Sequence, residues 1–383
     1  MSKRVVVLYP FYSQQNKETG KFLFRSCGST KMLRFIGEQL LRDGLTEKIR
    51  FAAPDSRLWG DDLSSVVPIE WIVECEIPPN NRLQRLTWPV RYWDPIFNGA
   101  DLVFNMHELI GWPLKNLYPA TRVISMFTVA PTGEPWPWMT PLINLGLLHS
   151  DLVTVPSEVM ARYVKSKTRD SGSMVVPSTW PLSFDREQLD YLLSLPPSGR
   201  RPMDFLFVFR ASASNYTHHR EFVQALRLIK KPRRIAFTDT TRYLRENPRE
   251  LDGLSLHDVE ILDDPGDQRQ YVDLLRRSHI VVGMNDNMHG GMGVREAMYT
   301  GAVPVLLDAP CYRELLPSGW PVWIPNPVTA EGIATALSRM LILSRGESDF
   351  APKFLQTRAV RESFQETWKV MKPQIEGLLE KGG

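Results

Sequence analysis

The chain has 383 residues, 46 Lys and Arg against 43 Asp and Glu for a net charge of +3, and 43% hydrophobic residues. This length exceeds that of one ordinary hydrophobic core and predicts two domains. No apolar stretch reaches the ~20 residues that span a bilayer, and the short β-branched run that ends at Pro10 is typical of a first strand rather than a signal peptide. We therefore expect a cytoplasmic protein.

The cysteines and the charge distribution indicate which kinds of site the protein can contain. Cys27, Cys75 and Cys311 are far apart and odd in number, which argues against a disulfide framework and against a zinc site. Residues 1–52 hold ten basic and four acidic residues. This imbalance suits either a solvated helix face or a surface for an anionic acceptor.

Short β-rich runs alternate with amphipathic helical stretches along the chain. Helical spacing of apolar residues is clear in 32–41 and 222–229. This alternation predicts an α/β protein with parallel sheets and crossover helices in two doubly wound domains. The predicted strands are Val5–Leu8, Ile49–Ala53, Leu102–Asn105, Val123–Phe127, Leu152–Val155, Phe205–Phe209, Arg234–Thr238, Val259–Leu262, Ile280–Val282 and Val303–Leu307.

Proline-rich sequence separates the two series of strands. The segment Leu195–Pro202 contains three prolines and predicts an interdomain connection near residues 180–200. After the second series the chain becomes helical, with Thr329 as the expected N-cap. A last helical stretch runs through Phe364 and Trp368.

The segment Gly283–Asp308 is the most informative part of the sequence. It has the order strand, glycine-rich loop, helix, turn and strand. Glycines let backbone N–H groups approach a ligand, and the following helix directs its positive end at the same place. Glu296 lies in that helix. The pattern indicates a site for a nucleotide sugar.

This segment resembles the signature of retaining GT-B glycosyltransferases of the family 4 type, in which Glu-Ala-Met follows a glycine loop. The resemblance implies two Rossmann-like domains that face each other across a cleft. Residues 1–182 would form the acceptor-binding domain, joined by the C-terminal helix 360–383. Residues 183–359 would bind the nucleotide sugar.

The resemblance also implies roles for residues of the second domain. Arg210 matches an arginine on the donor diphosphate, while the family's following lysine is absent, so that His218, His219 or Arg220 would replace it. Glu296 would accept hydrogen bonds from the ribose hydroxyls, a task that suits a carboxylate with two acceptor oxygens.

The sugar end of the predicted donor site departs from the family pattern. The family's first glutamate would fall at Met288, which moves the expected sugar contacts to Asp286, Asn287 and His289. The glycines of the loop would let the backbone pass close to the donor. They are Gly290, Gly291 and Gly293.

In the first domain, the run Asp101–Glu108 resembles a family strand whose terminal histidine faces the transferred sugar. His107 is the expected sugar contact and Glu108 its rival. One of the two would act as general base if the reaction inverted configuration. If the reaction retains configuration, the donor phosphate takes the proton.

The sequence lacks the motifs of several other classes of nucleotide-binding protein. The chain contains no Asp-x-Asp metal motif, no P-loop and no Gly-x-Gly-x-x-Gly after the first strand. The adjacent His218 and His219 have no third ligand at suitable spacing. We therefore expect no metal and no cofactor other than a UDP- or GDP-sugar as donor substrate.

The sequence thus predicts a glycosyltransferase, retaining by resemblance, and leaves its acceptor open among saccharides, small or lipid-linked molecules and hydroxymethylated bases in DNA. The basic segment 1–52, the cluster Lys230–Arg234 and the tryptophan-rich loop Thr132–Met139 favour the DNA alternative. A catalytically idle GT-B-like binding module is the alternative from a different class, because the first signature glutamate is missing.

Overall fold

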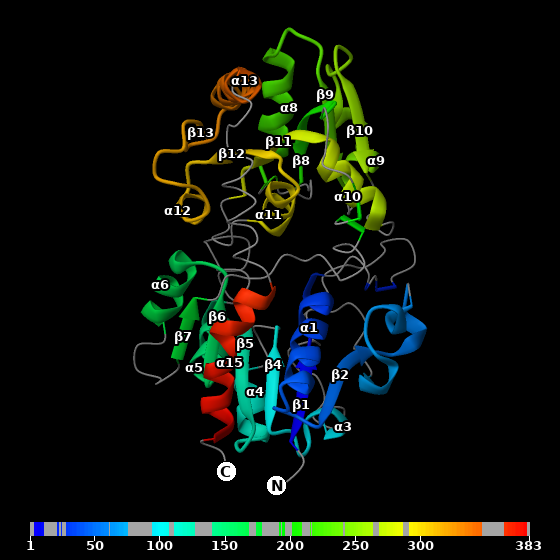
Figure 1. Cartoon of the computed structure of the whole chain (residues 1–383), viewed down its shortest axis with the longest axis vertical. Helices are drawn as coiled ribbons and strands as arrows, with labels where there is room; N and C mark the ends of the chain where they lie inside the picture. Colours follow the sequence, from blue (N-terminus) through cyan, green and yellow to red (C-terminus); the bar gives the residue numbers. More distant parts are fainter. Residues whose placement is uncertain are drawn as a thin grey trace. The chain divides into compact units, whose positions relative to one another are not determined.

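The computed structural model divides the chain into two compact units, residues 1–181 with 364–383 and residues 182–363. Each unit is built around its own sheet (Figure 1). The residues that the structure describes are 4–10, 21–22, 24, 28–60, 62–75, 94–106, 111–126, 140–167, 174–177, 191–192, 194–195, 201–208, 215, 217–239, 242–262, 268–285, 291–346 and 364–380.

The first unit contains a seven-stranded parallel sheet with strand order β3-β2-β1-β4-β5-β6-β7. The central strands are continuous apolar runs, as expected for parallel strands that are covered on both faces. The strands are β1 (Val5–Tyr9), β2 (Lys48–Pro54), β3 (Ile72–Cys75), β4 (Leu102–Asn105), β5 (Arg122–Met126), β6 (Leu152–Val155) and β7 (Met174–Pro177).

Helices of the first unit connect and cover these strands, and two separate clusters of buried apolar side chains pack against the sheet. The α-helices are α1 (Gly28–Arg42), α3 (Asp94–Phe97), α4 (Gly111–Leu117), α5 (Thr140–Leu148), α6 (Glu158–Lys167) and α15 (Phe364–Glu380). Short 3-10 helices in the described part of this unit are η1 (Ser56–Leu58), η2 (Leu63–Ser65) and η3 (Ile69–Trp71).

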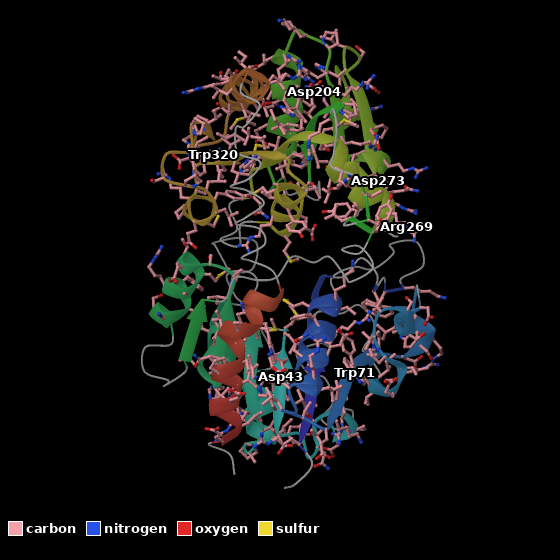
Figure 2. The ribbon with its side chains drawn as sticks, in the orientation of Figure 1. Asp43, Trp71, Asp204, Arg269, Asp273 and Trp320 are labelled. Atoms are coloured by element: carbon pink, nitrogen blue, oxygen red, sulfur yellow. The ribbon has the colours of Figure 1, made fainter. Side chains whose placement is uncertain are left out.

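The C-terminal helix α15 is anchored to the first unit by a polar contact. The Trp368 indole N–H donates to Asp43 Oδ2 at 2.9 Å, and Lys372 Nζ lies 3.0 Å from the same oxygen. Asp43 follows the end of α1 and is labelled in Figure 2. These hydrogen bonds, Trp368 first, lower the pKa of the Asp43 carboxyl. The helix thus belongs to the unit formed by the N-terminal half of the chain.

The second unit contains a six-stranded parallel sheet with strand order β10-β9-β8-β11-β12-β13. One continuous apolar core surrounds it. Its strands are β8 (Met203–Phe207), β9 (Arg234–Thr238), β10 (Asp258–Leu262), β11 (Ser278–Gly283), β12 (Val303–Leu307) and β13 (Trp323–Ile324).

The helices of the second unit pack in two pairs, α8 with α13 and α10 with α11. The strand order runs in opposite directions from β8 and from β11. Because crossover connections are right-handed, helices that connect strands on the β8 side and helices that connect strands on the β11 side cover opposite faces of the sheet. The helical elements are α8 (His219–Leu228), α9 (Tyr243–Glu246), η5 (Pro248–Leu251), α10 (Gln268–Arg277), α11 (Met292–Tyr299), α12 (Pro310–Arg313) and α13 (Ala330–Gly346).

The predicted fold class, two doubly wound α/β domains with parallel sheets, is confirmed. Each of the ten predicted strands coincides with or overlaps a strand of the structure, and β3, β7 and β13 are additional. Thr329 caps α13 as predicted, because its hydroxyl accepts from the Gly332 N–H at 3.1 Å. Among the residues described, no helix is both long and apolar enough to cross a membrane.

Candidate functional site

The strand order of the second sheet reverses between β8 and β11. Chain connections run outward from β8 in one direction and from β11 in the other, and Phe207 pairs with Val282 near the carboxyl ends of the two strands. In doubly wound sheets, ligands bind outside the carboxyl ends of the strands at such a switch point. The candidate site of this chain lies at that edge.

Residues 284–291 connect β11 to α11 in the sequence. Gly291 occupies the N-cap position of the helix with φ of +65°, a backbone conformation that favours glycine, and it has no side chain with which to cap the helix. The predicted contacts Asp286, Asn287, His289 and Gly290 lie outside the described residues.

Two glycines allow α11 to pack closely against the sheet. A Cβ on Gly293 would lie 3.2 Å from Val208 Cβ, just beyond β8, and 3.5 Å from the hydroxyl of Tyr271. A Cβ on Gly283 would lie only 2.9 Å from Val294 Cγ2 of α11 and 2.7 Å from Leu306 Cδ2 of β12. Gly283 and Gly293 therefore set the approach of the helix to the strands.

Glu296 lies about one turn into α11 and is only 2% exposed. Its Oε2 accepts a hydrogen bond from the Tyr271 hydroxyl of α10 at 2.5 Å. Burial, and then the neighbouring carboxylate, raise the pKa of Tyr271 well above its ordinary value, so this hydroxyl stays protonated and donates. Sequence reasoning missed Tyr271, because its position on the apolar face of α10 resembles that of a core residue.

Arg220 is engaged by acidic and phenolic partners at the start of α8. Its guanidinium contacts Glu250 through Nε and Nη2, with Nη2 at 2.9 Å from Oε1, and Nη2 donates to the Tyr243 hydroxyl at 3.2 Å. The hydrogen bonds to Glu250 and then Tyr243 raise the pKa of Arg220. A role in phosphate binding would require Arg220 to exchange these partners.

His219 is fully buried beside the same group. Its ring meets the Tyr243 ring edge-on at 5.6 Å between centroids, and its Nε2 lies 3.9 Å from Glu250 Oε2. Neither ring nitrogen has a hydrogen-bond partner among the described residues. Burial lowers the pKa of His219, so the neutral ring is favoured.

His218 precedes α8 in the left-handed conformation with φ of +56°. Its Nδ1 lies 3.8 Å from Glu221 Oε2. Of the three predicted replacements for the missing lysine, His219 is thus buried, Arg220 is paired with Glu250 and His218 is partly exposed.

The structure places Gly293 and Glu296 on α11, with Gly291 immediately before it, and the Tyr271 hydroxyl against this helix. His218, His219 and Arg220 form a second group with η5 and α9. Arg210, His107 and Glu108 lie outside the described residues.

Small polar side chains form a hydrogen-bonded ladder from the end of β4 through β5 to the turn that precedes β6. The Asn105 amide at the end of β4 donates to Ser125 Oγ at 3.4 Å, and Ser125 and Ser150 share a hydrogen bond of 2.6 Å. All three side chains are buried. The sequence that contains His107 and Glu108 follows this point of the chain.

The basic cluster Lys230–Arg234 lies at the opposite edge of the second sheet from the candidate site. It occupies the turn that leads into β9 and the first residue of that strand, and Lys230, Lys231 and Arg234 are exposed. The five residues of β9 separate the two edges by roughly 13 to 17 Å, given about 3.3 Å per residue. The cluster therefore does not line the candidate site.

Within the described ranges, no group of three or more His, Cys, Asp and Glu side chains is arranged to hold a metal ion.

No known protein-family model and no curated protein matches this sequence. Solved structures do match it over nearly its whole length. A glycosyltransferase from Rickettsia africae ESF-5 has a TM-score of 0.67 at 13% identity, with 99% of each chain covered.

Two further structures are as similar. HepE from Anabaena, solved in complex with UDP-glucose, has a TM-score of 0.66 at 15% identity, and 99% of each chain is covered. Sucrose-phosphate synthase from Thermosynechococcus elongatus has a TM-score of 0.66 at 14% identity, again with 99% of each chain covered. Likeness at these identities concerns the fold. The chain has the GT-B fold of these proteins, with two Rossmann-like domains.

Proposed function

We propose that this chain is a glycosyltransferase that moves a sugar from a nucleoside-diphosphate sugar to an acceptor hydroxyl with retention of configuration. The donor would bind at the carboxyl edge of the second sheet. The buried carboxylate of Glu296, held at the switch point one turn into α11, is the observation that carries this proposal.

The chemistry of α11 suits the two ends of a nucleotide. The amino end of the helix is the positive end of its dipole, which favours the diphosphate. Glu296 repels phosphate by its charge and accepts hydrogen bonds, which suits the neutral hydroxyls of the ribose. This arrangement orients the donor along the helix.

The solved relatives support a nucleotide-sugar donor. HepE was solved with UDP-glucose and, in another crystal, with UDP and glucose. We extend the donor class from these proteins to this chain and propose a UDP- or GDP-sugar. The first unit would then bind the acceptor.

In the proposed reaction, the acceptor oxygen forms a bond to the anomeric carbon of the sugar as the bond from that carbon to the diphosphate oxygen breaks. With retention, the departing diphosphate takes the acceptor's proton, and no protein base is needed. Arg210 would stabilise the charge that develops on the diphosphate. If the reaction inverted configuration instead, His107 or Glu108 would act as general base.

A saccharide or other small acceptor is favoured over a base in DNA. The DNA alternative depends partly on the cluster Lys230–Arg234, which lies at the edge of the second sheet away from the candidate site. Duplex DNA in a gel-shift assay at low and high salt tests this point. Tight binding at low salt that disappears at high salt would restore the DNA alternative.

The proposed function is tested in two steps. A thermal-shift screen with UDP, GDP and TDP should identify one diphosphate that raises the melting temperature, since a ligand of the folded state stabilises it. Transfer and hydrolysis assays with the matching sugars should then show turnover, and NMR of the product assigns its anomeric configuration. The absence of both stabilisation and turnover with every donor would favour an idle binding module.

A further inference from the structure

The Glu296 carboxylate is held by a side chain from a neighbouring helix, α10. The Tyr271 hydroxyl donates to one carboxylate oxygen at 2.5 Å, and this contact joins two residues that are 25 positions apart in the sequence. Such a short charge-assisted hydrogen bond is stronger than one between neutral groups. It restricts the orientation of the carboxylate plane.

The neighbouring glycine shows that the hydroxyl lies close over α11. Residues 293 and 296 share one face of the helix, because they are three positions apart. A Cβ on Gly293 would lie 3.5 Å from the Tyr271 oxygen and 3.2 Å from Val208 Cβ. A larger side chain at 293 would meet both neighbours, so the glycine preserves the space in which the hydroxyl meets the carboxylate.

We propose that Tyr271 is a positioning residue that aims the Glu296 carboxylate at the ribose hydroxyls and thereby sets the preference for a ribonucleotide donor. The inference rests on the proposed function. A carboxylate held in one orientation binds a ribose that has both hydroxyls better than a sugar that lacks one of them. A carboxylate that rotates freely can adapt to either sugar and discriminates less. The tyrosine, which remains protonated, keeps one oxygen engaged without competing for the ligand's donors.

A second tyrosine, Tyr191, lies outside α10 but contacts it and provides a matched control. Tyr191 donates to Asp273 of α10, with oxygen distances of 3.1 and 3.2 Å, and Arg269 lies over its ring. Asp273 and Arg269 both belong to α10 (Figure 2). Tyr191→Phe therefore removes a tyrosine–carboxylate contact from α10 without touching Glu296.

The experiment measures, by calorimetry, the affinity for the nucleoside diphosphate found in the thermal screen and for its 2′-deoxy counterpart. The wild type should prefer the ribonucleotide by roughly tenfold or more, the factor expected for one hydrogen bond to a charged acceptor. Tyr271→Phe should reduce this preference by about threefold or more, while Tyr191→Phe should leave it unchanged. A merely structural role would weaken both affinities equally, and the ratio would not move.

The outcomes separate this inference from the proposed function. If Glu296→Ala loses the preference and Tyr271→Phe changes it by less than about threefold, the positioning role is wrong and the ribose site stands. If Glu296→Ala keeps the full preference, both assignments are wrong. Melting curves of each variant, recorded without ligand, confirm that the compared proteins are folded.

Discussion

Replacement of Glu296 by alanine tests the centre of the proposed site, and the structure sets the size of both expected effects. The change removes a carboxylate that is 2% exposed and leaves the Tyr271 hydroxyl without this acceptor. An unsatisfied buried donor costs about 1–3 kcal/mol, so the free energy of unfolding should fall by that amount. The protein should remain folded, because this loss is smaller than the typical stability of about 5–15 kcal/mol.

The effect on binding should be larger than the effect on stability. Each hydrogen bond to a charged acceptor contributes about 1.5–3 kcal/mol, and two ribose hydroxyls lost together correspond to roughly a hundredfold increase in Kd or more. Calorimetric titration with the nucleoside diphosphate measures this change, and urea unfolding measures the stability. Arg210→Ala should also weaken binding, since the diphosphate loses a cation.

Glu260→Ala is the control for this experiment. Glu260 is an exposed carboxylate of β10 in the same unit, and it pairs with Arg277 at 2.8 Å. Exposed pairs contribute at most about 1 kcal/mol, so neither stability nor binding should change much. The site assignment would be refuted if both Glu296→Ala and Arg210→Ala bound the nucleotide within about threefold of the wild-type affinity. A threefold change is well below the effect of losing one hydrogen bond to a charged group.

Three further predictions concern stability. Asp43→Ala should lower the free energy of unfolding by about 1–3 kcal/mol in urea titrations, because Trp368, which is 7% exposed, loses its acceptor; an unchanged midpoint would contradict this anchor. Gly283→Ala should cost about 1–3 kcal/mol through overpacking against β12, whereas Gly319→Ala, whose Cβ would meet nothing within 4 Å, should cost much less; equal losses would be inconsistent with the steric reasoning. Burial lowers the folded-state pKa of His219 below its ordinary value of 6.5, so the unfolded chain binds the proton first and stability falls as pH drops below about 6.5. His219→Phe should reduce this loss, which is at most about 1.4 kcal/mol per pH unit; identical pH profiles of unfolding for both proteins would show that the ring does not resist protonation.

The strands show how far local sequence determines this fold. β9 and β12 begin and end at the predicted residues, because a buried parallel strand is a continuous apolar run bounded by polar or turn residues. The strands that the sequence did not predict, β3, β7 and β13, have two to four residues, and β13 is only Trp323–Ile324. Such short segments become strands by pairing with a neighbour, which a local pattern does not show.

The residues of the candidate site also differ in whether local sequence predicts them. The loop glycines and Glu296 were predicted from a contiguous motif, since a strand, a turn and a helix amino end leave their pattern in consecutive residues. The contact of Tyr271 with Glu296 and the pairing of Arg220 with Glu250 join residues 25 and 30 positions apart. Helix packing, rather than any local preference, decides which side chains meet over such separations. Local sequence thus locates the proposed nucleotide-binding motif, whereas only the packing of distant segments sets how the Glu296 carboxylate is held and pairs Arg220 with Glu250.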